Sequence, residues 1–225
     1  MQENMDIKKQ DKDSAMEIFE ETKQFEELMM MYECAIQEVK TKFEVLDREF
    51  SVRYKRNPIA GIESRVKSPM SIYRKLKKNG LEVSVRTITK NLNDVAGIRI
   101  ICNFIDDIYD IVKLLMRQDD LRIVSIKDYI RNPKPNGYRS YHMIVEIPVF
   151  FAKGKQIMRV EVQIRTIAMN FWASLEHQLR YKKNIESIEG IEEISQALLE
   201  AANTIAETDQ KMQEIKNKIG LFEII

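Results

Sequence analysis

The stretch Met158-Arg159-Val160-Glu161-Val162-Gln163-Ile164-Arg165 decides how this chain folds. Apolar and polar side chains alternate strictly along it. A period of two predicts a β-strand that has one face in a core. The other face carries two arginines, a glutamate and a glutamine, a dense row of hydrogen-bonding groups. That face is either an ordinary solvated sheet face or the floor of a site for a charged ligand.

The composition describes a folded protein of one large domain, or of one domain with helical extensions. Hydrophobic residues make up 44% of the 225 residues. No apolar run reaches the roughly 20 residues that cross a bilayer. The N-terminus has neither the basic start nor the apolar stretch of a secretory signal. We therefore expect a cytoplasmic protein with no membrane partner.

Soft metal ligands are scarce in this chain. The histidines are His142 and His177, and the cysteines, Cys34 and Cys102, are far apart. A zinc site is therefore not expected. Any catalytic metal has to be held by oxygen, which favours magnesium bound together with phosphates.

The net charge of +1 hides a strong partition along the chain. Residues 1–50 hold 14 acidic and 7 basic side chains, and residues 183–225 hold 9 and 4. The middle, residues 51–182, holds 25 basic and 12 acidic side chains and so carries a net charge of +13. A positive centre between acidic flanks indicates a phosphate-rich ligand, with nucleic acid as a second interpretation.

Hydrophobic spacing predicts the order of the secondary-structure elements. After a disordered segment 1–13, a long amphipathic helix runs from about Ser14 to residue 50. A loop at Arg53–Gly61 precedes a short helix that Ser68-Pro69 starts and Asn79-Gly80 ends. A further helix covers Asp106–Arg117. Strands are expected at Ile98–Phe104, Leu121–Lys127, Tyr138–Ile147 and Gln156–Arg165.

Two helices are predicted to close the chain. Thr166 caps the first, which has a buried stripe of Phe171, Trp172, Leu175 and Leu179. The second has a narrow apolar seam formed by Ile194, Leu198, Ala202, Ile205, Met212, Ile215 and Ile219. We therefore expect an α/β (α+β) fold with a mixed β-sheet of about five strands, flanked by long N- and C-terminal helices. These outer helices either pack on the sheet and each other or form a subunit interface.

Basic side chains gather around the start of the short helix. They are Arg65, Lys67, Arg74, Lys75, Lys77 and Lys78. Free N–H groups at a helix N-terminus add to such a charge, and the combination suits a polyphosphate. The last two lysines also fit an ordinary solvated helix face.

The segment Asp94-Val95-Ala96-Gly97-Ile98-Arg99 leads into the first predicted strand. A carboxylate at this point can offer a metal ligand at a sheet edge, although aspartate is also a routine loop residue. Asp94 and Glu161 are the carboxylates best placed to meet across neighbouring strands. Two carboxylates that hold magnesium among basic groups describe a site for phosphoryl or nucleotidyl transfer.

The segment Lys134-Pro135-Asn136-Gly137-Tyr138-Arg139-Ser140-Tyr141-His142 joins a turn to a strand. Tyr138 and His142 share one strand face. A tyrosine with a lysine and a histidine nearby can stack on a purine and neutralise its phosphates. The alternatives are an aromatic at the rim of a core and a histidine with an ordinary structural role.

These motifs together resemble the RelA/SpoT-type alarmone synthetase domain, and in this short form the stand-alone small alarmone synthetases. The resemblance covers roughly residues 54–183. Its motifs are Arg65-x-Lys67-Ser68, Ser71-Ile72-Tyr73-Arg74-Lys75, Asp94-x-x-Gly97-Ile98-Arg99, Asn136-Gly137-Tyr138-Arg139-Ser140-Tyr141-His142, Val160-Glu161-Val162-Gln163-Ile164-Arg165-Thr166, Asn170-Phe171-Trp172 and Glu176-His177. The resemblance implies a nucleotidyltransferase-like synthetase fold.

The resemblance also implies an activity, that of a (p)ppGpp synthetase, or GTP pyrophosphokinase, of the stringent response. Such enzymes use Mg²⁺ and move pyrophosphate from ATP to the 3′-hydroxyl of GDP or GTP, which gives ppGpp or pppGpp and AMP. By similarity, Asp94 and Glu161 bind the metal, and Glu161 also accepts the proton of the attacking hydroxyl.

The remaining site residues are also assigned by similarity. Arg65 and Arg99 are expected to sandwich the adenine of ATP, because planar guanidiniums stack well on purines. Lys67 and Lys75 hold the ATP phosphates. Tyr138 stacks on guanine. The rest of the GTP or GDP acceptor is bound by Lys134, His142, Gln163 and Asn170.

The sequence patterns and the resemblance together divide the chain into a disordered start (1–13), a helical extension (14–50), a catalytic domain (51–183) and a C-terminal oligomerisation helix (184–225). A homo-oligomer is expected, with a tetramer as the specific state. Long relatives carry a hydrolase domain with a His-Asp metal site, whereas this chain has no histidine before His142. Synthesis without hydrolysis is therefore predicted.

The competing hypothesis is a binding module, either an RNA-binding regulator or a nucleotide sensor. Its basic centre would grip phosphates without chemistry and with strong salt dependence. Asp94 and Glu161 favour the synthetase, because a pure phosphate binder gains nothing from carboxylates without a metal. The charge pattern also leaves room for single-stranded RNA as a partner that competes with nucleotide.

Overall fold

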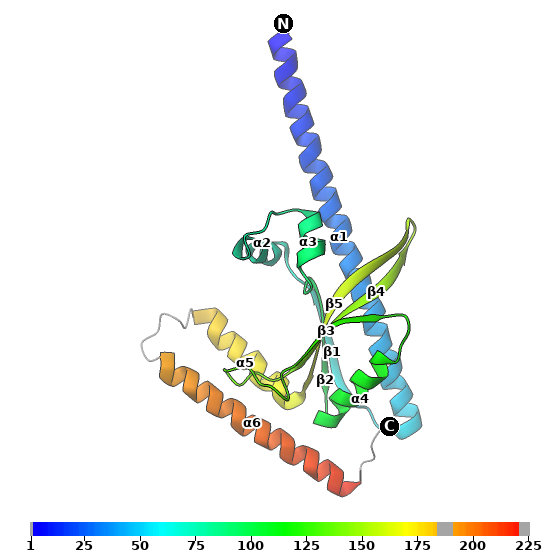
Figure 1. Cartoon of the computed structure of the whole chain (residues 1–225), viewed down its shortest axis with the longest axis vertical. Helices are drawn as coiled ribbons and strands as arrows, with labels where there is room; N and C mark the ends of the chain where they lie inside the picture. Colours follow the sequence, from blue (N-terminus) through cyan, green and yellow to red (C-terminus); the bar gives the residue numbers. More distant parts are fainter. Residues whose placement is uncertain (1, 184–190, 221–225) are drawn as a thin grey trace.

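A five-stranded mixed sheet forms the centre of the protein (Figure 1). The computed structural model describes residues 2–183 and 191–220. Across the sheet the strands lie in the order β1 (Ile59–Val66), β2 (Ala96–Cys102), β5 (Gly154–Thr166), β4 (Tyr141–Phe151) and β3 (Arg122–Asp128). β2 and β5 are parallel, and the other neighbours are antiparallel. The predicted mixed α/β fold is confirmed.

Six helices surround this sheet in the described ranges. They are α1 (Gln2–Tyr54), α2 (Pro69–Lys78), α3 (Val85–Asn91), α4 (Ile105–Met116), α5 (Ile167–Lys183) and α6 (Ile191–Ile219). Figure 1 shows the sheet nearly edge-on, with α1 and α4 on one side, α5 and α6 on the other, and α2 and α3 beyond one end of the strands, where α3 packs against α1. Part of the sheet face on the α5 and α6 side is not covered by these helices. None of these helices is long and apolar enough for a bilayer crossing.

The main core lies between the sheet and the α1–α4 layer. The alternating apolar residues of β2 and β5, among them Ile98, Ile100, Val160 and Val162, are at most 2% exposed and point into it. From α1 the core receives a stripe at helical spacing: Leu28, Tyr32, Ala35, Ile36, Val39, Phe43, Leu46 and Phe50. The predicted amphipathic helix is therefore present, and the polar half of each strand is left to face the uncovered side.

Two N-terminal predictions differ from the structure. The helix begins at Gln2, so the segment predicted to be disordered is helical from residue 2 onward. Its lysines and glutamines are good helix formers, and polarity alone does not distinguish a helix from disorder. The predicted loop at Arg53–Gly61 overlaps β1, an edge strand in which Ile59 is the buried residue. A strand with so little apolar alternation gives no period-two signal.

Serine residues cap the N-termini of the short helices α2 and α3. Ser68 accepts a hydrogen bond from the backbone N–H of Ser71, and Pro69 occupies the first turn of α2, as predicted. Gly80 follows the helix end at φ +66°, where glycine is favoured. α3 was not predicted, although Ser84 caps it in the same way by accepting from Thr87.

The C-terminal helices bury less apolar surface than predicted. Of the stripe expected on α5, Trp172 is buried, whereas Phe171, Leu175 and Leu179 are 58%, 44% and 51% exposed. Along α6, Ala202 is buried but Met212, Ile215 and Ile219 are exposed. The reason is that α5 and α6 pair with each other over a small second core of Trp172, Ala173 and Ala202. Residues 184–190 and 221–225 lie outside the described residues.

A buried ionic cluster fastens the end of α6 to the start of α4. Lys216 is 2% exposed, and its Nζ lies 2.6 Å from Oδ1 of Asp106 and 3.4 Å from Oδ1 of Asp107. Arg56 pairs with Asp107 from the loop before β1. Burial raises the pKa of Asp107 despite these cations. The cluster therefore joins three separate parts of the chain through charges that depend on one another.

Replacing the central cation should loosen this junction. We expect Lys216→Met to lower the free energy of unfolding by about 3–5 kcal/mol, because it removes a cation from the fully buried carboxylate of Asp107. The exposed Lys218→Met on the same helix should stay within about 0.5 kcal/mol of the parent. Urea unfolding followed by the fluorescence of Trp172, the single tryptophan, measures both. Equal stabilities of the two variants would contradict the role given to Lys216.

Candidate active site

The polar faces of three neighbouring strands lie side by side on the uncovered side of the sheet. In one row Arg65 of β1 is opposite Gly97 of β2, which is opposite Glu161 of β5. In the next row Glu63, Arg99 and Gln163 are opposite one another, and His142 of β4 continues that row. Because side chains alternate along a strand, all of these point away from the core.

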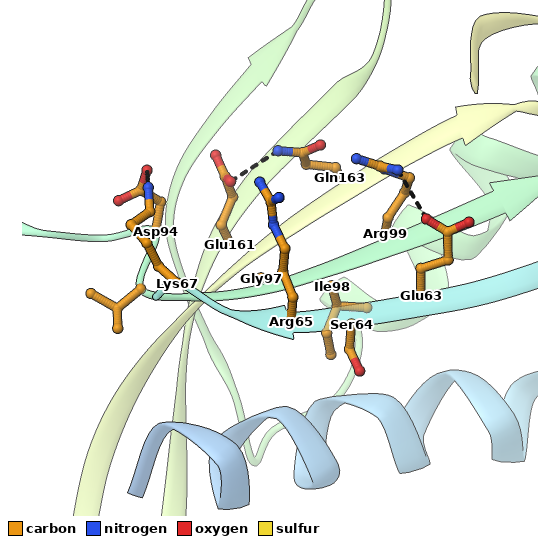
Figure 2. A pocket seen from close by; sticks show the side chains of 11 residues that line it. Glu63, Ser64, Arg65, Lys67, Asp94, Gly97, Ile98, Arg99, Glu161 and Gln163 are labelled. Carbon is orange, nitrogen blue, oxygen red and sulfur yellow. Dashed lines mark hydrogen bonds and ion pairs between the residues drawn. The ribbon is translucent and has the colours of Figure 1, made fainter. Parts of the chain in front are cut away.

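These rows form the floor of a cavity of about 430 Å³ (Figure 2). Six of the predicted site residues line this cavity. The lining residues are Glu63, Ser64, Arg65, Lys67, Asp94, Val95, Gly97, Ile98, Arg99, Glu161 and Gln163. Figure 2 shows that the carboxylates of Asp94 and Glu161 point to the same side of the sheet. Glu161 and Gln163, the middle of the polar row of β5, thus form part of the floor of a pocket.

Asp94 joins the sheet to α2 at one end of the pocket. Its Oδ2 accepts hydrogen bonds from Nζ of Lys67 at 2.8 Å and of Lys75 at 2.6 Å. The backbone N–H of Lys67 also donates to the carbonyl of Val95 at 2.8 Å, which holds the two segments together. Burial raises the pKa of the Asp94 carboxyl, but the two ammonium groups outweigh that effect and lower it. Asp94 is therefore ionised at neutral pH.

The second oxygen of Asp94 is suited to an additional ligand. This Oδ1 is buried and has no hydrogen-bond partner within the described residues, although buried polar atoms normally find one. The described ranges contain no group of three or more His, Cys, Asp or Glu side chains that could form a closed metal site. A hard cation at Asp94 and Glu161 would take its remaining oxygens from phosphate or water, which suits magnesium.

Glu161 is held at both carboxylate oxygens. Nε2 of Gln163 donates to Oε2 at 2.9 Å, and Nδ1 of His142 lies 3.6 Å from Oε1. Burial raises the pKa of Glu161, and the charge of Asp94 acts in the same direction. The contacts with His142 and Gln163 outweigh both and lower it. Glu161 is therefore an ionised carboxylate of fixed orientation.

Arg65 and Arg99 stand on adjacent strands at the other side of the pocket. Nη1 of Arg99 donates to Oε2 of Glu63 at 2.9 Å, which fixes its guanidinium near the sheet. Arg65 is exposed. Gly97 separates Arg65 from Glu161, and a Cβ there would come no closer than 3.9 Å, to the carbonyl oxygen of Arg65. At Gly97 the floor of the pocket is therefore formed by main-chain atoms.

An aromatic and cationic group adjoins Gln163 at the far end of β5. Nζ of Lys134 lies 4.8 Å from the ring centroid of Tyr138, and the guanidinium of Arg165 lies 5.1 Å from it. Nε2 of His142 is 2.8 Å from the Tyr138 hydroxyl oxygen. Asn170, on α5, accepts a hydrogen bond from Arg165 at 3.4 Å. All eleven predicted site residues thus lie in or beside one contiguous region.

The loop that carries Tyr138 rests on α6. Gly137 has φ +84°, and a Cβ added there would lie 2.5 Å from Cβ of Ala202, so the position requires glycine for both reasons. Arg139 donates to the Gly137 carbonyl at 3.0 Å and to Asn203 at 3.3 Å. The C-terminal helix therefore helps to place the aromatic side of the site.

Two residues of this region received no role from the sequence. Glu63 lies in the unpredicted strand β1, so its pairing with Arg99 was not foreseeable. Arg165 belongs to the alternating polar face, which was the available signal. Its burial, at 5% exposed, depends on contacts with α5 and with the loop before β4, and periodicity within one strand does not report such contacts.

Comparison with known proteins agrees with this geometry. Residues 64–186 match the family described as the region found in RelA / SpoT proteins. Over 191 residues, the chain is 44% identical to the GTP pyrophosphokinase YwaC of Bacillus subtilis, a match that covers 85% of this chain and 90% of that protein.

Solved structures give the same result. Small alarmone synthetase 2 of Bacillus subtilis superposes with a TM-score of 0.76 at 44% identity, covering 84% of this chain and 96% of that one. Small alarmone synthetase 1 of the same species, bound to its product pppGpp, superposes with a TM-score of 0.79 at 34% identity, covering 88% and 98%. The chain therefore belongs to the RelA/SpoT family, as an enzyme of the GTP pyrophosphokinase class and of the small alarmone synthetase type.

Proposed function

We propose that this chain transfers pyrophosphate from ATP to the 3′-hydroxyl of GDP or GTP, producing ppGpp or pppGpp and AMP. The observation that carries the proposal is a single pocket in which two ionised carboxylates, Asp94 and Glu161, lie together with Arg65, Lys67 and Arg99. A relative that is 34% identical binds pppGpp as its product. An in-line transfer between two nucleotides requires such charge neutralisation and little covalent chemistry from the protein.

The donor nucleotide is assigned to the Arg65 side of the pocket. Arg65 and Arg99 stack on the adenine with their planar guanidiniums. The backbone floor at Gly97 lets the nucleotide approach the sheet closely. Lys67 and Lys75, which share one oxygen of Asp94, supply positive charge to the ATP phosphates.

Asp94 and Glu161 are the residues that would hold Mg²⁺ in this site. When bound, the ion supplies charge neutralisation on the phosphate oxygens. Glu161 has a second task in the proposal, since it accepts the proton of the attacking 3′-hydroxyl. Its lowered pKa makes it a weak but always ionised base, so positioning contributes more to the rate than basicity.

The acceptor nucleotide is assigned to the other end of β5. Tyr138 stacks on guanine, and Lys134, His142, Gln163 and Asn170 bind the remainder of GDP or GTP. Because His142 and Gln163 also contact Glu161, the acceptor lies beside the proposed base. This arrangement brings the 3′-hydroxyl within reach of the carboxylate.

The proposal extends to the assembly and the scope of the enzyme. The exposed apolar side chains Phe171, Met212, Ile215 and Ile219 on α5 and α6 support a homo-oligomer, for which we propose a tetramer. We also propose synthesis without hydrolysis and a cytoplasmic location. Light scattering gives the mass, and incubation of purified ppGpp with the protein tests hydrolysis.

The base assignment predicts a defined loss. The parent protein with Mg²⁺, ATP and GDP should form ppGpp and AMP, resolved by anion-exchange chromatography. Glu161→Gln should lower kcat by about 10²–10⁴-fold, the range of general base catalysis. The amide remains isosteric, so the affinity for a non-hydrolysable ATP analogue should fall less than kcat. Turnover of this variant at the parent rate would refute the assignment.

The donor assignment predicts a steric effect at Gly97. Gly97→Val projects methyl groups into the pocket, and should raise KM for ATP at least about tenfold, the effect of roughly 1.4 kcal/mol. Gly61→Val is the matched control, because it also lies in a strand and its Cβ meets the side chain of Ile101 at 3.8 Å outside the pocket. Steady-state kinetics at saturating GDP distinguish them. A parent KM for ATP in Gly97→Val would exclude binding over this glycine.

The contacts around Glu161 predict a pH effect. A carboxyl whose pKa is lowered in the folded enzyme supports activity above that pKa and loses it as the pH falls through it. Gln163→Leu removes one of the lowering hydrogen bonds. The acid limb of kcat/KM should therefore move to higher pH in this variant. An unchanged acid limb would show that Gln163 does not set the ionisation of the base.

A further inference from the structure

Arg165 is a buried cation that lacks a buried anion. Its side chain lies on the same strand face as Glu161 and Gln163, yet the residue is 5% exposed. Nη2 donates to the hydroxyl oxygen of Tyr138 at 2.7 Å and to Oε1 of Gln163 at 2.9 Å, and Nη1 donates to Asn170. Nε is buried without a partner among the described residues. All of these acceptors are uncharged. Burying the charged guanidinium without an opposite charge beside it costs folding free energy.

The contacts of Arg165 belong to a closed ring of five side chains. Arg165 contacts Gln163 and Tyr138, Gln163 contacts Glu161 at 2.9 Å, and Tyr138 contacts His142 at 2.8 Å. His142 closes the ring at 3.6 Å from Glu161. One arm of the ring is therefore an amide, and the other is a phenol followed by an imidazole. Both arms begin at Arg165 and end at the two oxygens of Glu161.

Hydrogen-bond chemistry gives both arms one direction. An arginine only donates, so Oε1 of Gln163 faces Arg165 and the amide N–H groups face Glu161. The Tyr138 oxygen likewise accepts from Arg165, and its own O–H can then point to Nε2 of His142. In the neutral imidazole this leaves the hydrogen on Nδ1, which faces the carboxylate of Glu161. A single guanidinium thus orients two donors toward the carboxylate.

We propose that Arg165 is a positioning residue that sets the direction of both arms around Glu161 and so couples the tyrosine of the acceptor side to the base. The inference rests on the proposed function for its catalytic consequence. Each oxygen of Glu161 keeps a second lone pair for the pocket, so the ring orients the carboxylate without consuming it. Residues that orient a ligand group in this way typically affect activity by about 10–100-fold.

The test substitutes the guanidinium and keeps its charge. Arg165→Lys should lower kcat by about 10–100-fold and raise KM for GDP, with the affinity for a non-hydrolysable ATP analogue unchanged. Arg159→Lys is the matched control, since Arg159 lies on the same strand but pairs with Glu146 and Asn93 outside the ring. It should behave as the parent.

A spectroscopic reading of His142 separates positioning from a merely structural role. In protein labelled with ¹⁵N-histidine, the ring-nitrogen signals of His142 should report hydrogen on Nδ1 in the parent and should lose this preference in Arg165→Lys. Tyr138→Phe removes one oxygen from the ring with little risk to folding, and should change the same signals. Because both substitutions break the same arm, their effects on kcat should not add.

Each result decides the inference. Unchanged His142 ring-nitrogen signals in both variants, or additive losses in kcat, would overturn it. If Arg165→Lys fails to fold, Tyr138→Phe alone decides by the His142 signals. If the parent makes no alarmone, the proposed function fails, whereas the His142 signals still test the ring itself.

Discussion

The parallel pairing of β2 with β5 is the constraint on which the rest of the structure depends. It places Gly97 beside Glu161 and Arg99 beside Gln163, and it sends the intervening isoleucines and valines into the core under α1. A slip of one residue would exchange the two faces, burying the carboxylate and exposing the core. The apolar half of each strand therefore holds the polar half in position, and fold stability and site geometry share one cause.

Within that frame the site has two differently supported carboxylates. Asp94 is stabilised as an anion by full positive charges, those of Lys67 and Lys75. Glu161 is stabilised by oriented donors, and the cation Arg165 lies behind Gln163 on one arm and behind His142 and Tyr138 on the other. In the first arrangement the two lysines can turn from Asp94 to the phosphates of a nucleotide. The second arrangement keeps its geometry. This difference matches the proposed function, in which the donor side neutralises charge and the acceptor side holds a hydroxyl in line.

Strand alternation and helix-capping residues were sufficient to predict those elements whose position depends on neighbouring residues in the chain. Alternation identified β2, β4 and β5, and Ser68-Pro69 identified the start of α2. β1 was missed because an edge strand with one buried residue has no alternation. Contacts between distant segments were also invisible: the burial of Arg165 needs the loop at Tyr138 and α5 together. The exposure of Phe171 follows from the pairing of α5 with α6, which a helical stripe does not reveal.

The convergence of Asp94 and Glu161 on one divalent cation is the central claim, and Mn²⁺ provides the most direct measurement. A crystal grown with Mn²⁺ and a non-hydrolysable ATP analogue should show an anomalous peak within about 2.0–2.3 Å of an oxygen from each carboxylate, close to the distances of magnesium-type sites. The phosphates should complete the coordination, and Lys67 and Lys75 should have turned toward them. A peak bound by neither carboxylate, or nucleotide seated away from Arg65 and Arg99, would contradict the account.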